Sequence, residues 1–282
     1  MVQSILAFMD GRCDAQPMIA LSTAMARRLG ARIRALTIAD TRRAFSLATG
    51  CEGASFYVTE QEQLEKLESR QVAVHAAFTH ACLQAGVNFD VRRMSGDPFE
   101  LLPREARFQD LVIVGWRPPL PDWRASEGEG TLDPHSLVDL VAGGVHPLLI
   151  ARESALNQPR VLLVNDGTAA AGRSIRNFLR QRLWPEASLR LLTVARDESV
   201  ARELLRESAE LLSLTNGRGE IDFESGFACG PLRKILVPYV EKWGADLVVL
   251  GVSRSHGLLR RILGTAAVDV LRRTGCALYL GE

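Results

Sequence analysis

The chain has 282 residues, of which 47% are apolar and 24% are charged, and its formal net charge is +1. This length favours two domains over one. A net charge so close to zero gives no field that would hold the chain to nucleic acid or to an anionic membrane surface, so we expect neither as a partner.

Cysteines and the first residues bear on where the protein works. The 5 cysteines are scattered without CxxC spacing, and an odd number fits reduced thiols better than a fully paired secreted framework. The start, MVQSILAFMDGRC, has a short apolar run ended by Asp10 and no basic segment before it, which predicts a strand and not a signal peptide. No apolar run reaches membrane-spanning length. We therefore predict a cytoplasmic protein.

In chain order, the predicted elements alternate between strands and helices. Amphipathic helices are predicted at residues 18–29 and 174–183, and a long helix at about 59–85. The strands are unbroken apolar runs such as LVIV (111–114) and LVVL (247–250), a pattern typical of strands that are buried on both faces of a parallel sheet. Such alternation indicates a doubly wound sheet with right-handed crossovers, which binds ligands beyond the carboxyl ends of its strands where the strand order reverses.

An internal repeat decides the architecture. Residues 5–39, from ILAFMDG to LTIA, match residues 161–195, from VLLVNDG to LTVA, without a gap. Further on, residues 96–115 correspond to 230–251, and each copy ends in a closing strand, at 145–151 and 274–281. The polar connector ESALNQP places the boundary near residues 153–159. We predict an α/β fold of two tandem doubly wound domains, residues 1–152 and 158–282, each an open five-stranded parallel sheet flanked by helices.

These features together resemble the universal stress protein family. They are an apolar first strand ending in an aspartate, a long second helix, the GDP turn at 96–98, the strand GADLVVLG at 244–251 and a glycine loop before the last helix. The resemblance covers nearly the whole chain, tandem members of the family are familiar, and it implies an adenine-nucleotide α-hydrolase-like fold. In nucleotide-binding members, the pattern G-x2-G-x9-G-[S/T] after the fourth strand cradles the phosphates, and the aspartate of the first strand contacts the adenosine.

The second copy carries most of that pattern. Residues 251–265 read GVSRSHGLLRRILGT, so Gly251, Gly264 and Thr265 fall on the first glycine, the third glycine and the hydroxyl. Arg254 replaces the second glycine. We expect Thr265 to begin the last helix, where its hydroxyl and the free N–H groups would hold a phosphate at the positive end of the helix dipole. The resemblance implies an adenine-nucleotide ligand: ATP with Mg²⁺, AMP or a signalling nucleotide. The predicted binding residues are Asp166, Val194, Gly251, Arg254, Gly264 and Thr265.

Structural roles are the alternative for these residues. The glycines are then turn residues, Thr265 is a helix-terminal hydroxyl, and Asp166 caps the helix that follows it.

The first copy keeps Asp10 and Gly115 of the family pattern. A loop with prolines and two tryptophans replaces the glycine pattern, and Ser136 stands opposite Thr265. We therefore expect a nucleotide site in the second copy only.

Motifs for catalysis and metal binding are missing from the sequence. It has no GxxxxGK[ST] loop and no GxGxxG after a strand, and GVSRS lacks the second glycine of a nucleophile elbow. The spacing of His75, His80 and Cys82 does not put them on one helix face as zinc ligands. Cys276, in the closing strand, is interpreted as a buried small hydrophobe. The loops DGRCD and DGTAA do not match the SGGxDS loop typical of α-hydrolase-like enzymes.

We predict no catalytic residue and at most slow ATP hydrolysis. The favoured function is a regulatory stress-response protein that works by binding. The alternative is a nucleotide-free interaction module that acts through protein partners. For either function we expect self-association, through an intramolecular pseudo-dimer of the two halves or through a homodimer.

Overall fold

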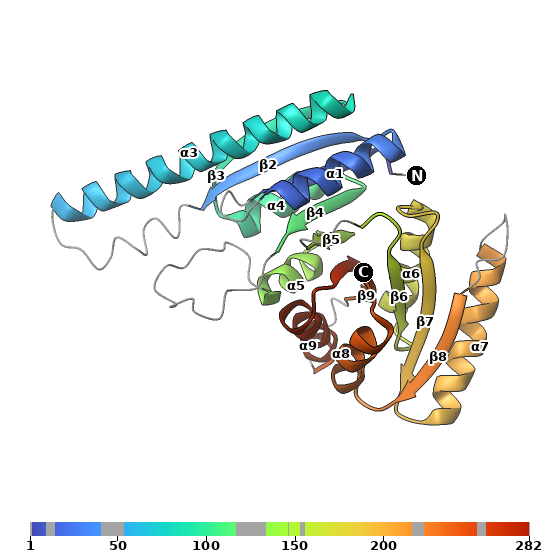
Figure 1. Ribbon diagram of the computed structural model, residues 1–282. Coiled ribbons are helices and arrows are strands. Elements are labelled where there is room, and N and C mark those ends of the chain that lie inside the picture. The colour runs from blue at the N-terminus through green and yellow to red at the C-terminus, as the bar shows by residue number, and fades with distance from the viewer. Residues whose placement is uncertain are drawn as a thin grey trace. The chain divides into compact units, whose positions relative to one another are not determined.

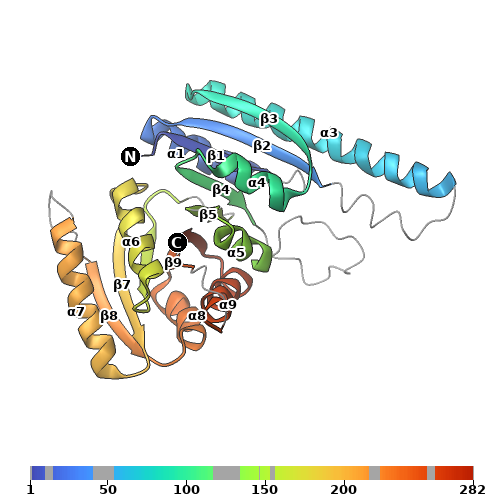
Figure 2. The same ribbon diagram turned by 180° about the vertical axis from the view of Figure 1, so that it is seen from behind.

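The computed structural model describes residues 2–9, 15–40, 54–116, 134–145, 147–152, 156–215, 223–252 and 258–281 (Figure 1). Within these ranges the side chains at 54–64, 66–68, 211–215, 223–225 and 258–265 are outside the description. Contacts divide the chain into two compact units, residues 2–133 and residues 134–282. Figure 2 shows both from the opposite side.

The first unit holds a parallel sheet in the order β3-β2-β1-β4. Its elements are β1 (Ser4–Phe8), α1 (Gln16–Leu29), β2 (Arg32–Asp40), α3 (Ala54–Ala85), β3 (Phe89–Gly96), α4 (Pro98–Ala106) and β4 (Leu111–Gly115). Local chemistry sets several of these bounds. Gly30 ends α1 in the left-handed conformation, at φ 63°, and the Asp97 carboxylate accepts a hydrogen bond from the Phe99 N–H (2.8 Å) to begin α4.

The second unit holds a six-stranded sheet in the order β5-β10-β9-β6-β7-β8. Its strands are β5 (Leu148–Ala151), β6 (Arg160–Asn165), β7 (Ser188–Ala195), β8 (Phe223–Cys229), β9 (Leu247–Gly251) and β10 (Ala277–Gly281). Its helices are α5 (Pro134–Ala142), α6 (Ala169–Gln181), α7 (Glu198–Thr215), α8 (Leu232–Trp243) and α9 (Leu258–Arg273). All neighbouring strands run parallel except β5 and β10, which are antiparallel.

The predicted fold class, α/β with a largely parallel sheet flanked by helices, is confirmed. Strands β9 and β10 are buried along their whole length, as the unbroken apolar runs predict. The helices predicted at 18–29, 59–85 and 174–183 correspond to α1, α3 and α6. Of the helices that the structure describes, none is long and apolar enough to cross a membrane.

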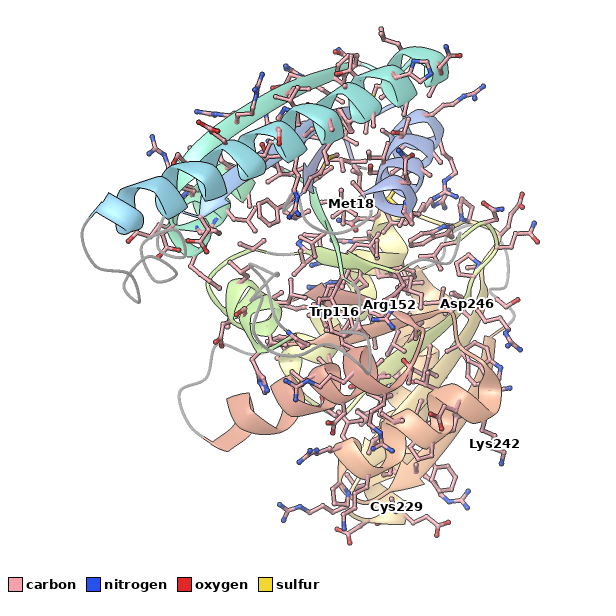
Figure 3. The ribbon with its side chains drawn as sticks, turned by 60° about the vertical axis from the view of Figure 1, so that its left-hand side comes forward. Met18, Trp116, Arg152, Cys229, Lys242 and Asp246 are labelled. Carbon is pink, nitrogen blue, oxygen red and sulfur yellow. The ribbon has the colours of Figure 1, made fainter. Side chains whose placement is uncertain are left out.

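The strand that closes the first sequence repeat belongs to the second compact unit. In that unit β5 pairs with β10, with Ile150 opposite Leu278, and α5 packs against α9. Arg152, labelled in Figure 3, follows β5 and donates hydrogen bonds to the carbonyls of Leu271 (3.2 Å) and Thr274 (2.7 Å) at the end of α9. The contacts therefore divide the chain before Pro134, whereas the domain ranges 1–152 and 158–282 remain a prediction about the repeat.

Candidate functional site

The strand order of the second unit reverses between β6 and β9. The chain runs outward from β6 to β7 and β8 and then returns to β9 and β10 on the other side of β6. Ligands of open parallel sheets bind beyond the carboxyl ends of the strands at such a point. The register pairs Leu163 of β6 with Val249 of β9, so both strands end at the same edge of the sheet. This edge is the candidate site.

Asp166 lies directly after β6 and supports the start of α6. Its Oδ1 accepts hydrogen bonds from the Thr168 N–H (3.1 Å) and the Thr168 hydroxyl (2.7 Å). Thr168 is the N-cap of α6, and its hydroxyl oxygen accepts a hydrogen bond from the Ala171 N–H (3.2 Å). The carboxylate thus holds the capping residue in place, a structural role close to the one that the sequence offered as an alternative. Asp166 is half-buried.

Asn165, which the sequence analysis missed, fixes the turn between β6 and α6. It is buried, its Oδ1 accepts a hydrogen bond from the Gly167 N–H (2.9 Å), and its Nδ2 donates to the Ser208 hydroxyl on α7 (2.7 Å). Gly167 has a φ of 80°, which favours glycine. A polar residue at the end of an otherwise apolar strand, where the first repeat has Met9, was the signal that could have revealed this role.

Gly251 ends β9 and lies against the first turn of α6. A Cβ added there would overlap the backbone of Ala170 and Ala171 and would lie 2.6 Å from the Ala170 carbonyl oxygen. The space beside Gly251 is therefore filled by the helix that Asp166 and Thr168 begin. In the first repeat, the nearest atom to such a Cβ at Gly115 is the Cβ of Met18, at 3.6 Å. Close packing thus requires a glycine at this position in the second unit and not in the first.

The expectation that the last helix begins at Thr265 is wrong. Helix α9 spans Leu258–Arg273, so Gly264 and Thr265 lie inside it and their N–H groups are not among the unpaired ones at a helix start. The residues LLRRIL at 258–263 favour helix, and one glycine opposes it by only about 1 kcal/mol. In the first repeat, by contrast, α5 begins at Pro134, just before Ser136, because proline suits the first helical position.

Comparison with protein families bears on this unit. The model of the universal stress protein family matches residues 159–280. These residues form a universal stress protein domain. A search of curated protein sequences found no relative.

Solved structures match the whole chain at low identity. A universal stress protein from Archaeoglobus fulgidus is 15% identical with a TM-score of 0.68, covering 99% of this chain and 96% of its own. A functionally unknown protein from Pseudomonas aeruginosa is also 15% identical, with a TM-score of 0.59, covering 99% of this chain and 92% of its own. These likenesses show the fold. A universal stress protein in complex with cAMP is 22% identical and covers 45% of this chain and 98% of its own, but its TM-score of 0.37 is too low to support an argument.

The universal stress protein domain brings some of the predicted binding residues together. Asp166 and Gly251 lie at the edge where β6 and β9 end. Val194 lies at the same edge, one residue beyond the pair formed by Asn165 and Thr193, with its side chain buried at 4% exposure. Arg254 falls outside the described residues, and so does the side chain of Thr265.

One described side chain at this edge, Asp166, has the chemistry to contact a nucleoside. A half-buried carboxylate beside the reversal point can accept a hydrogen bond from a ribose hydroxyl or an adenine amino group. The phosphate positions of the family pattern include Arg254, which lies outside the described residues. Gly251 supplies no open cradle for a phosphate, because α6 occupies the space that a side chain at Gly251 would fill.

Other groups that the sequence singled out have structural explanations. Within the described ranges, no group of three or more His, Cys, Asp or Glu side chains is placed to hold a metal ion. Cys276 is 3% exposed, and its burial, helped by Asp246, raises the pKa of the thiol to about 12. It is therefore a buried thiol and not a nucleophile, as expected. Trp116 is buried, and Trp123 and Asp10 lie outside the described residues.

Proposed function

We propose that the universal stress protein domain binds an adenine nucleotide, ATP with Mg²⁺, at the edge where β6 and β9 end. Through this binding the chain acts in the cytoplasm as a regulatory stress-response protein. One observation supports the proposal above the others: in a domain of this family, Asp166 and Gly251 lie at the point where the strand order reverses.

Four of the predicted binding residues would contact the nucleotide, each in a distinct way. The Asp166 carboxylate accepts a hydrogen bond from the nucleoside while Oδ1 holds Thr168. Val194 contributes an apolar contact at the end of β7, and Arg254 pairs its charge with a phosphate. Gly264 and Thr265 lie inside α9, so of this pair only the Thr265 hydroxyl is left as a phosphate contact. Bound Mg²⁺ would neutralise part of the phosphate charge.

Isothermal titration with Mg-ATP tests this proposal. The wild-type chain should bind one ATP, and Asp166→Asn should weaken binding roughly ten- to a hundredfold, because a hydrogen bond to a charged group is lost. Asparagine keeps an oxygen for Thr168, so α6 should still begin correctly. Thr168→Ala is the matched control: it breaks the same hydrogen bond but leaves the carboxylate, so affinity should be retained. No heat from the wild type, or an unchanged affinity in Asp166→Asn, would contradict the proposal.

A nucleotide-free interaction module is the second candidate. Two observations favour it: α9 continues through Gly264 and Thr265, and one oxygen of Asp166 is already engaged by Thr168. This function predicts no nucleotide in the supernatant of heat-denatured protein and no heat with Mg-ATP. Self-association is expected for both candidate functions and does not separate them; light scattering coupled to size exclusion would measure a homodimer as a dimer mass.

A further inference from the structure

A groove in the first unit is lined by both apolar and polar side chains. It lies between α3 and β3, is open to solvent and has a volume of about 510 Å³. β3 is the outermost strand of its unit, paired with β2 on one side (Figure 2). Five large apolar side chains among the described residues are exposed, and three of them line this groove: Val72 at 50%, Leu83 at 66% and Val91 at 37%. The groove therefore gathers most of the exposed large apolar side chains of the described residues.

A buried histidine lines the same groove without a partner. His75 of α3 is 6% exposed, and neither ring nitrogen has a hydrogen-bond partner in the part of the chain that the structure describes. Burying an unpaired polar group is unfavourable, so such groups commonly mark a missing water or ligand. Burial, and secondly the charge of Arg93, lower the pKa of His75 to about 4. At neutral pH the ring is uncharged and offers one N–H donor.

Arg93 supplies the positive charge of the groove. Side chains alternate between the two faces of a strand, so Arg93 shares the groove face with Val91, while Arg92 points to the other face and pairs with Glu105 (2.8 Å). No described carboxylate pairs with Arg93. Its register partner on β2 is Thr37, which is fully buried and whose hydroxyl has no partner among the described residues.

We propose that this groove binds a small monocarboxylic acid with an apolar body. Its carboxylate pairs with Arg93 and accepts a hydrogen bond from His75, and its apolar body covers Val72, Leu83 and Val91. The lining decides the class of ligand: the groove offers the Arg93 cation, the neutral His75 ring, the polar side chains of Thr79 and His80, and apolar walls. This combination matches an amphipathic acid, because a phosphate ion would leave the apolar walls uncovered.

Octanoate, used below its micelle concentration, is the probe. Titrated into the full chain, it should shift the imidazole NMR signals of His75, assigned by their loss in His75→Gln, and should bind with measurable affinity by calorimetry. Arg93→Gln should weaken binding at least about tenfold, as loss of a charged hydrogen bond predicts. Arg104→Gln is the matched control, because Arg104 is an exposed arginine on α4 that does not line the groove. The octanoate affinity of this variant should equal that of the wild type.

Three results would overturn the proposal. They are no binding of octanoate to the wild type, equal affinity in Arg93→Gln and the wild type, and inorganic phosphate that binds as tightly as octanoate. Equal binding of phosphate would mean that the groove binds anions in general and that the apolar walls do not contribute to affinity. Because Arg93 is exposed, its glutamine variant should fold, and circular dichroism of each variant checks this.

Discussion

Replacing Gly251 with alanine tests the packing on which the candidate site depends. The new Cβ would overlap the backbone of Ala170 and Ala171, and backbone atoms at the start of a capped helix cannot rotate away as a side chain can. Overpacking of this kind costs typically about 1–3 kcal/mol, and a backbone clash belongs at the upper end. Alanine recovers up to about 1 kcal/mol by restricting the unfolded chain. We expect a net loss of about 2 kcal/mol or more.

Gly115→Ala is the matched control, since it makes the same change at the equivalent position of the first repeat. There the nearest atom would be 3.6 Å away, an ordinary van der Waals distance, so stability should change by less than about 1 kcal/mol. Urea unfolding followed by circular dichroism measures both. With a slope of about 2 kcal/mol per molar, Gly251→Ala should lower the midpoint by about 1 M. Equal midpoints for the two variants, or rescue of Gly251→Ala by Ala170→Gly, would refute the reasoning, because the clash is with backbone.

Three further predictions concern single side chains. Burial and Arg93 lower the pKa of His75 from 6.5 to about 4, so between these values the unfolded chain binds a proton that the folded chain does not, and stability falls as pH falls. From pH 7 to pH 5 the free energy of unfolding should drop by about 2 kcal/mol through this group, a loss absent from His75→Gln in urea titrations at both pH values. Thr168→Ala should cost about 1 kcal/mol as a lost N-cap, and Thr168→Ser should restore most of it in the same assay. Asn165→Leu leaves the Gly167 N–H without its acceptor and should cost about 1–3 kcal/mol, with faster hydrogen exchange at Gly167.

The order of elements was predictable because local patterns determine it. Buried parallel strands are unbroken apolar runs, and the repeat fixes their spacing, so the fold class followed from the sequence. The antiparallel pairing of β5 with β10 did not, because the pairing of two closing strands depends on tertiary contacts that leave no local pattern. The predicted start of α9 was wrong for a different reason. The glycine pattern suggested a loop up to Thr265, but the residues before Gly264 favour helix.

The candidate site was predictable in position and less so in detail. Asp166 and Gly251 were found by their place at strand ends, which a doubly wound sheet brings together. The residues that contact Asp166 and Gly251 could not be predicted from the spacing of the sequence motif. These contacts depend on how the first turn of α6 approaches β9. Oδ1 of Asp166 holds Thr168, and Ala170 and Ala171 fill the space beside Gly251.

The two repeats use equivalent polar positions differently. In the second unit the Thr193 hydroxyl donates to the Ala201 carbonyl on α7 (2.9 Å), and Asn165 links β6 to the same helix, so the polar groups near the strand ends are paired within the domain. In the first unit Thr37 stands at the position of Thr193 with no partner among the described residues, and Met9 replaces Asn165. Because an unpaired buried hydroxyl is unfavourable, Thr37 leaves an unsatisfied polar group inside the first unit, whereas the equivalent Thr193 is paired with α7 in the second unit.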